Sequence, residues 1–186
     1  MEEGDLIKGV WFVTARRHVL ESQGASALHA IAGGMRPENR HAMLEPLSSE
    51  WYAEEVFQDS LHAVHDVHAK LDTRVFDKFL EDCTVLGINA FFRVLLRASS
   101  PAYLLRQMPA VGRQYRRNAW VCEVDAGEER GTIAWRNVPY LADRVYRHCA
   151  IVTTVQCLQV CTGVRPRAEI VDQGADFMTV GLSYGR

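Results

Sequence analysis

The chain has 186 residues, of which 48% are hydrophobic and 24% are charged, and its formal net charge is −2. These values are typical of an ordinary globular protein. The chain is long enough to form one domain, whose core can be stable without disulfide bonds or a structural metal ion. The absence of a dense basic stripe argues against a protein that binds nucleic acid.

The charge is unevenly distributed, because residues 1–93 hold 9 Lys and Arg against 15 Asp and Glu, whereas residues 94–186 hold 12 against 8. Such a dipolar surface predicts salt-sensitive association with a protein partner, including a homodimer. The acidic start is unlike a signal peptide, and polar residues interrupt the apolar run 150–161. The odd number of five cysteines fits free thiols in a reducing compartment, so we expect a cytoplasmic protein without a membrane span.

The first half has apolar residues at helical spacing. A helix is predicted from about Phe12 to Gly24, and Gly33-Gly34 predicts a loose connection between two short helices. Ser99-Ser100-Pro101 should end one helix and begin the next, which Pro109 should kink or break after Met108. The other predicted helices cover residues 25–32, 37–44, 53–71 and 72–96.

From Trp120 the apolar residues recur with a period of two, which is typical of half-buried strands. Strands are predicted at 120–125, 132–137, 168–172 and 177–184, with one long helix at 140–161 between the two pairs. We therefore predict a single α+β domain, 1–186, with a helical half at 1–117. Its second half, 118–186, is a four-stranded antiparallel ββαββ sheet crossed by the long helix.

His62, His65 and His68, with Asp59 and Asp66, form the sequence most like a metal site, because ligands three or four residues apart can share a helix face. However, successive steps of three rotate by about 300°, so the three histidines do not converge. A solvated helix face is the simpler explanation. We predict no metal and keep His62 and His65 as weak candidates.

Three cysteines of the long helix, Cys149, Cys157 and Cys161, could form a thiolate site. Only Cys157 and Cys161, which are four residues apart, share a helix face. The alternative is that all three are small hydrophobic residues in a helix–sheet contact.

Arg113, Arg116 and Arg117 could bind an anion or an acidic partner, because guanidinium groups pair with carboxylates and phosphates. A solvated basic helix end is the alternative, as is neutralisation of Glu123 or Glu128. The aromatic residues are numerous enough either to line an apolar ligand pocket or to fill a core. The residues predicted to line such a pocket are Phe91, Phe92, Tyr103, Val152 and Leu158.

Three stretches resemble a paralogous family of unknown function that is expanded in myxobacteria: Lys8-Gly9-Val10 with Trp11-Phe12-Val13, residues 48–52, and residues 99–106. This bacterial family is similar in layout to a ligand-binding superfamily. The superfamily unites haem–nitric-oxide domains, vinyl-reductase-type sensor domains and small subunits of the Golgi transport particle. The resemblance implies a helical first half packed on an antiparallel sheet with one crossing helix.

The chemistry of that superfamily matches this sequence poorly. Its haem members ligate iron with a histidine on the helix before the sheet, and residues 103–117 here contain none; Val111 and Gly112 occupy the expected place. The Tyr-x-Ser-x-Arg motif that holds the haem propionates is also missing. No cysteine follows Cys161, where vinyl-reductase-type relatives often carry a pair, and the acyl-bearing cysteine of transport-particle subunits cannot be assigned to Cys83.

No Ser-His-Asp order, phosphate-binding glycine loop or pair of carboxylates stands out, so the sequence favours a protein that is not an enzyme. The first hypothesis is a cytoplasmic regulatory or signalling domain without a cofactor, which binds a protein partner or a small apolar ligand. The alternative hypothesis is a metal- or haem-dependent sensor domain.

Overall fold

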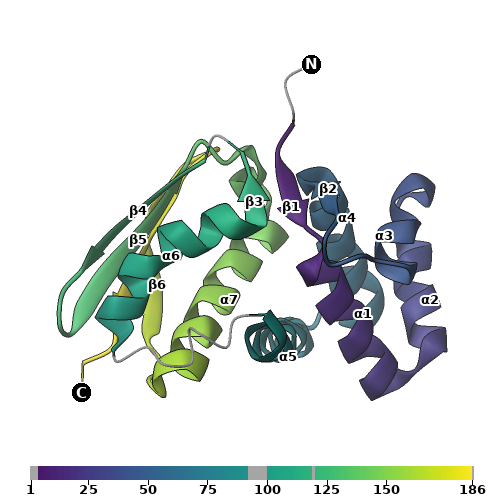
Figure 1. The fold of residues 1–186 in the computed structure, drawn as a ribbon, viewed down its shortest axis with the longest axis horizontal. Helices are drawn as coiled ribbons and strands as arrows, with labels where there is room; N and C mark the ends of the chain where they lie inside the picture. The colour runs from purple at the N-terminus through teal and green to yellow at the C-terminus, as the bar shows by residue number, and fades with distance from the viewer. Residues whose placement is uncertain (1–3, 92–99, 119, 186) are drawn as a thin grey trace. The chain divides into compact units, whose positions relative to one another are not determined.

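The computed structural model describes residues 4–91, 100–118 and 120–185 (Figure 1). The chain divides into two compact units. The first unit comprises Met1–Gly87 and Tyr115–Asn118, and the second comprises Ile88–Gln114 and Ala119–Arg186. None of the helices within the described ranges is long and apolar enough to cross a membrane.

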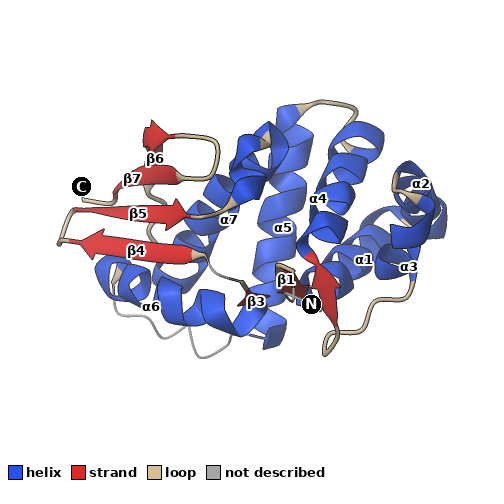
Figure 2. Ribbon diagram, turned by 90° about the horizontal axis from the view of Figure 1, so that it is seen from above, coloured by secondary structure: helices blue, strands red, loops and turns tan. Residues whose placement is uncertain are grey.

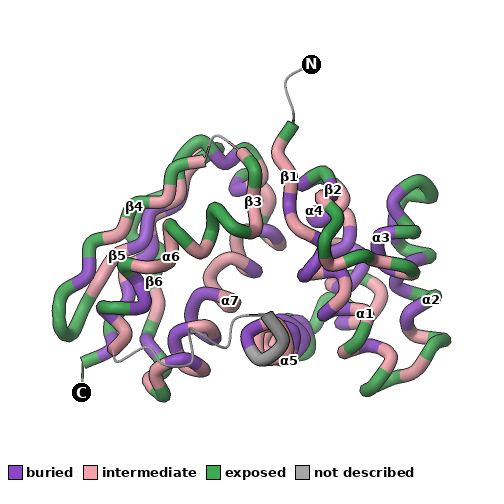
Figure 3. The backbone as a smooth tube through the Cα atoms, in the orientation of Figure 1, coloured by how far each residue is buried: buried purple, intermediate pink, exposed green. Residues whose placement is uncertain are grey.

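Helices dominate the first unit. Phe12, Leu61, Phe76, Phe79 and Leu80 are among its fully buried side chains, and the last three follow helical spacing on one helix. Figure 3 shows such buried positions of α1 in purple between less buried ones. The helical elements are α1 (Val10–Gln23), α2 (Ala25–Gly34), a 3-10 turn (Pro37–Asn39), α3 (Arg40–Leu44), α4 (Glu54–Ala63), a π-helix (Val64–His68) and α5 (Thr73–Phe91).

A three-stranded antiparallel sheet in the first unit is a feature that the sequence did not predict. Its order is β2-β1-β3, with β1 (Leu6–Lys8) between β2 (Trp51–Ala53) and β3 (Arg116–Arg117). Ile7 pairs with Tyr52 on one side and with Arg116 on the other. Strands of two or three residues are too short to show a period of two, so only their pairing reveals them.

Gly9 explains why α1 begins at Val10 rather than near Phe12. A Cβ atom on Gly9 would lie 2.0 Å from the carbonyl oxygen of Leu47 and 2.8 Å from the Tyr52 ring. The Gly9 amide also donates a hydrogen bond of 2.9 Å to the Glu50 carbonyl. Glycine therefore lets the start of α1 pack directly on the loop before β2.

Three local predictions for the helices are wrong. Gly33 and Gly34 are not a loose connection but the last residues of α2, where a Cβ on Gly34 would meet Val67 at 2.7 Å. The helix predicted at 53–71 is a strand end, α4 and a π-helix. The break predicted after Met108 is wrong, because α6 (Pro101–Tyr115) continues through Pro109, while its buried residues Ala102, Leu104 and Leu105 lie before the proline. The alternative, a kink at Pro109, stays a prediction. Residues 92–96 of the predicted helix at 72–96 lie outside the described residues.

The second unit contains the predicted ββαββ arrangement. Its antiparallel sheet has the order β4-β5-β7-β6, seen edge to edge in Figure 2. Val124, Ile133, Val180 and Ile170 lie opposite one another across the four strands, so they share one sheet face. The elements are α6, β4 (Val121–Ala126), β5 (Arg130–Arg136), a 3-10 turn (Pro139–Ala142), α7 (Arg144–Thr162), β6 (Arg167–Gln173) and β7 (Met178–Ser183).

The long helix α7 has well-defined ends. The carboxylate of Asp143 accepts hydrogen bonds from the Val145 and Tyr146 amides at 2.7 and 3.0 Å, which is typical of an N-cap. The predicted start at 140 is therefore early, because residues 139–142 form a 3-10 turn. Gly163 ends the helix with φ +76°, a left-handed conformation that favours glycine.

Helices α6 and α7 lie on one side of the second unit's sheet (Figure 1). The Arg106 guanidinium of α6 donates to the Ala126 carbonyl of β4. Ser100 and Pro101 start α6 as predicted, because the Ser100 hydroxyl accepts from the Tyr103 amide at 3.2 Å.

Strand β6 is an exposed edge strand with a bulge. Ile170 pairs with Val180 and Asp172 pairs with Thr179, so Val171 is an extra residue between them. A Cβ on Gly181 would lie 3.0 Å from the Val171 side chain, so Val171 covers the sheet where β7 carries no side chain.

Candidate functional site

A groove between α1 and α5 is the candidate site of the first unit. It has a volume of about 340 Å³ and is open to solvent. It combines two carboxylates, a hydroxyl and an imidazole with an apolar side, so it can accept a small molecule that carries both polar and apolar groups. Its lining residues are His18, Glu21, Ser22, Asp82, Val85 and Leu86.

Two histidines from different elements lie against the same phenyl ring beside this groove. The ring centroid of Phe79 is 5.3 Å from that of His18 and 5.5 Å from that of His68. His18 Nε2 is 3.9 Å from Asp82 Oδ2, and His68 Nε2 is 3.3 Å from Gln23 Nε2. The imidazoles are therefore held by packing on one side and by polar groups on the other.

Burial keeps both imidazoles neutral more readily than in water. It lowers the pKa of His18, and Lys78 lowers it further, while the charges of Asp82 and Glu21 raise it. It also lowers the pKa of His68, with a second contribution from a positive charge on His18. A positive charge on His18 therefore opposes protonation of His68.

We predict that replacing His18 and His68 by glutamine will flatten the dependence of stability on pH. Because both pKa values are lowered from 6.5 in the folded state, the unfolded chain binds more protons there, and stability falls as the pH falls through about 6.5. Glutamine cannot take up these protons. Thermal unfolding between pH 8 and 5 measures the effect.

A His29→Gln variant is the control, since His29 is exposed on α2. It should follow the wild-type curve. A double variant that loses stability with acid as steeply as the wild type would contradict the assignment to His18 and His68.

The predicted metal candidates have different surroundings. His65 Nδ1 is 2.7 Å from Asp66 Oδ1, and the His65 ring packs on Phe76. His62 lies in the last turn of α4. Across the described ranges, no group of three or more His, Cys, Asp and Glu residues is arranged to hold a metal ion. A role for His62 or His65 in metal binding stays a weak expectation.

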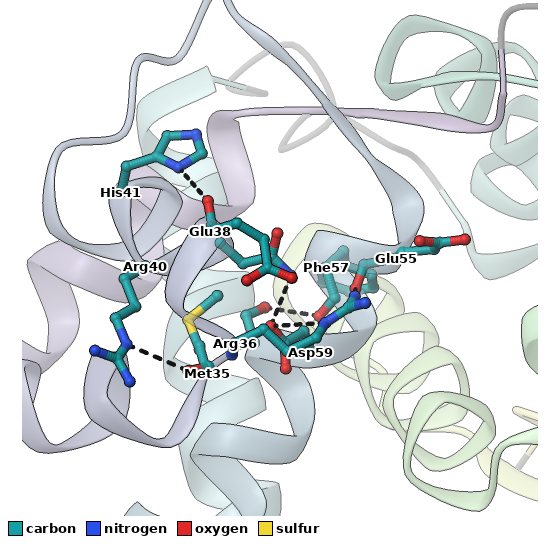
Figure 4. Close-up of polar contacts among 10 residues, drawn as sticks. Met35, Arg36, Glu38, Arg40, His41, Glu55, Phe57 and Asp59 are labelled. Atoms are coloured by element: carbon teal, nitrogen blue, oxygen red, sulfur yellow. Dashed lines mark hydrogen bonds and ion pairs between the residues drawn. The ribbon is translucent and has the colours of Figure 1, made fainter.

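Asp59, which the sequence grouped with these histidines, belongs to a different polar cluster (Figure 4). Its Oδ2 accepts from the Arg36 amide at 3.0 Å and from Asn39 Nδ2 at 2.7 Å. The Arg36 guanidinium lies 3.6 Å from the same oxygen. Asp59 therefore ties the connection between α2 and α3 to α4, which is a structural role.

The three arginines predicted to bind an anion or a partner have separate positions. Arg116 forms an ion pair of 3.1 Å with Glu54, whose side chain is 0% exposed. Arg117 stacks on the Trp51 ring at 4.2 Å, whereas Arg113 lies in the last turn of α6. The carboxylate that pairs with Arg116 therefore belongs to the same unit as Arg116, the first one. Binding of an external anion by these arginines stays a prediction.

The residues predicted to line an apolar pocket are described only in part. Phe92 and the side chain of Phe91 lie outside the described residues. Tyr103 is 51% exposed, Leu158 is fully buried, and Val152 is intermediate. This pocket therefore stays a prediction.

The sequence did not point to His18, Phe79 or Asp82, and it grouped His68 with a possible metal cluster rather than with Phe79. They come from α1, the π-helix and α5, and only the packing of these three elements brings them together. The helix face shared by Cys157 and Cys161 was predicted from their spacing, and the interaction between the two thiols raises the pKa of Cys157 and lowers that of Cys161.

No protein-family model matches the chain, and no curated protein matches it. Solved structures do. An H-NOX protein from S. oneidensis in the Fe(II)NO state has a TM-score of 0.70 at 15% identity, with 97% of this chain and 100% of that chain covered. The Fe(II) unliganded H-NOX protein from K. algicida has a TM-score of 0.67 at 13% identity, with 97% of both chains covered.

The chain has the H-NOX fold. The predicted α+β class and the layout expected from haem–nitric-oxide domains are therefore confirmed as a fold. At this low sequence identity the similarity does not assign a ligand to this chain. The iron and nitric oxide named for these structures belong to those proteins. Membership of the myxobacterial family stays an expectation.

Proposed function

We propose that this chain is a non-catalytic sensor domain of a cytoplasmic signalling system. In this proposal, binding of a small ligand changes how the domain binds a protein partner. Its main support is the similarity to H-NOX structures over 97% of the chain. H-NOX domains act as sensors, and the catalytic residue sets sought in the sequence did not stand out.

Because the similar solved structures are H-NOX proteins, haem is the first candidate for the ligand of this chain. An apolar ligand, or a protein partner without a ligand, comes second. The residues of this chain do not fit the usual attachment of haem. The helix before the sheet is α6, and it carries no histidine; Val111 and Gly112 stand where the iron ligand is expected. His148 on α7 is the single histidine in the sequence of the second unit.

A haem-independent sensor is the second version of the same proposal. The absence of a histidine from α6 favours it, since iron would need a different ligand. In this version the sensed molecule is a small apolar compound or a protein segment, as the sequence suggested. The proposal includes a homodimer and excludes nucleic acid as a partner.

Haem titration of the purified chain separates the two versions. We expect no saturable one-to-one complex and no absorption spectrum of histidine-ligated iron, because α6 supplies no imidazole. A saturable complex with a sharp Soret band would establish the haem version instead. Replacing His148 by alanine in that complex would test whether α7 supplies the iron ligand.

The sensor role itself is tested by native mass spectrometry and pull-down from cell extracts. We expect a retained small molecule or a reproducible protein partner. If neither is found with haem-loaded or haem-free protein, the proposed function is wrong in both versions.

A further inference from the structure

The two edges of the second unit's sheet differ in their regularity. In the strand order β4-β5-β7-β6, the edge strands are β4 and β6 (Figure 2). The bulge at Val171 interrupts β6, whereas β4 pairs with β5 along its whole length without a register shift. Val121–Ala126 also contains no proline or lysine, the residues that commonly block an edge. Strand β4 therefore keeps the regular backbone spacing that an added strand needs.

The turn between β4 and β5 shows which residues of β4 direct their backbone groups away from β5. The Gly127 amide donates to the Arg130 carbonyl at 2.8 Å, so these two residues form a hydrogen-bonded pair. In antiparallel strands such pairs alternate with pairs whose backbone groups point outward. Counting back along β4, the outward residues are Ala126, Val124 and Cys122.

Arg106 agrees with this count and closes one end of the edge. Its guanidinium, on α6, donates to the Ala126 carbonyl. The amides and carbonyls of Cys122 and Val124 meet no hydrogen-bond partner among the residues that the structure describes. Each of these two residues thus offers one N–H and one C=O to an extended peptide, as in recognition by strand addition.

The side chains of β4 indicate which kind of peptide fits. Val124 lies opposite buried Ile133, whereas Glu123 and Asp125 are exposed on the other face of the sheet. Arg136 lies 2.9 Å from Glu123, but Asp125 forms no ion pair with any described residue. A strand added beside β4 would bring its own side chains to within about 5 Å of these carboxylates. Lysine or arginine at alternate positions would therefore stabilise the pairing.

A second copy of β4 is a poor occupant of this edge. An antiparallel pair of β4 strands that used both Cys122 and Val124 would be centred on Glu123. It would place the Glu123 side chains of the two copies directly opposite one another, and like charges in that position are destabilising. The acidic residues thus disfavour self-pairing and favour a basic partner.

We propose that β4 is the docking edge for an extended segment of a partner protein that carries lysine or arginine at alternate positions. The segment forms backbone hydrogen bonds with Cys122 and Val124, and its basic side chains lie beside Glu123 and Asp125. The proposal rests on the proposed function, because that function supplies the protein partner, and it names the surface that the partner meets.

A synthetic peptide in which lysine alternates with threonine tests the edge, with amide hydrogen exchange of the full chain followed by NMR. We expect saturable binding, and at least about 10-fold slower exchange of the Cys122 and Val124 amides in the complex. The Glu123 and Asp125 amides, which point toward β5, should be protected with and without the peptide. A peptide of the same composition with its lysines in one block should bind at least about 5-fold more weakly, because it cannot place its charges on one face.

Charge reversal on β4 gives a second readout. Asp125→Lys should weaken binding of the lysine–threonine peptide by at least about 5-fold, because an attraction becomes a repulsion. Glu128→Lys is the matched control, since Glu128 is exposed in the connection between β4 and β5 and the change in net charge is the same. At an ionic strength of about 0.15 M, where charges act over about 8 Å, this variant should bind as the wild type does.

Three results would overturn the proposal: no saturable binding, equal binding of the block peptide, or binding that leaves the Cys122 and Val124 amides unprotected. Protection of these amides on concentrating the chain without peptide would also overturn it, because a second copy would then occupy the edge. If pull-down recovers a partner while the peptide fails, the docking edge is wrong and the proposed function stands.

Discussion

Replacing Arg116 by methionine will lower the free energy of unfolding by about 3–5 kcal/mol, because it removes the guanidinium from a buried carboxylate. Glu54 is 0% exposed, and Arg116 Nη2 lies 3.1 Å from its Oε1. The Arg116 guanidinium also lies over the Phe57 ring at 5.5 Å. Urea denaturation followed by circular dichroism gives the free energy, and hydrogen exchange at β1 locates the loss.

Arg117→Met is the matched control, since Arg117 is the next residue of β3. It is exposed and loses only a stacking contact on Trp51, worth about 0.5–1 kcal/mol. A double variant, Arg116→Met with Glu54→Leu, should recover most of the loss, because it removes both charges of the buried pair. If Arg116→Met costs no more than Arg117→Met, the ion pair does not stabilise the first unit.

Phe79→Ala is expected to cost about 3–5 kcal/mol, the range for removing a buried phenyl ring. Phe79 is 1% exposed and contacts the rings of Trp11, His18 and His68. The cavity would also admit water to both imidazoles. Their pKa values should therefore rise toward 6.5, which NMR titration of the histidine ring protons can follow.

Val75→Ala is the control on the same helix, because Val75 is 41% exposed and lies one turn earlier in α5. We expect a change within about 0.5 kcal/mol. An unfolding free energy that falls equally in both variants would show that α5 is simply intolerant of alanine. Unchanged histidine titration in Phe79→Ala would contradict the account of burial by Phe79.

The ββαββ half could be predicted because its signals are local. Val121–Ala126 alternates in exposure as the sequence alternates in polarity, and Asp143 and Gly163 mark the ends of α7 by their own chemistry. The first sheet gave no such signal, because β1 pairs with residues near 52 and 116 that are remote in sequence. Its strands exist through tertiary pairing rather than local pattern.

The π-helix is the main reason why the surroundings of the three histidines could not be predicted from the sequence. A regular helix through 53–71 sets the three histidines at steps of three, but Val64–His68 is wound with wider turns. Within this segment the His65 ring packs on Phe76 and the His68 ring packs on Phe79. Helix periodicity alone cannot show it. The pair Cys157 and Cys161 was predictable, since it lies on one uninterrupted helix.

The bulge in β6 bears on how copies of this chain can meet. An open edge strand normally offers a regular row of amides and carbonyls on which another strand can grow. At Val171 that row loses its regular spacing, and the strand bends. The bulge thus limits extension of the second unit's sheet at the β6 edge. A homodimer that formed at the β6 edge would therefore rely on contacts between side chains rather than on regular strand pairing across that edge.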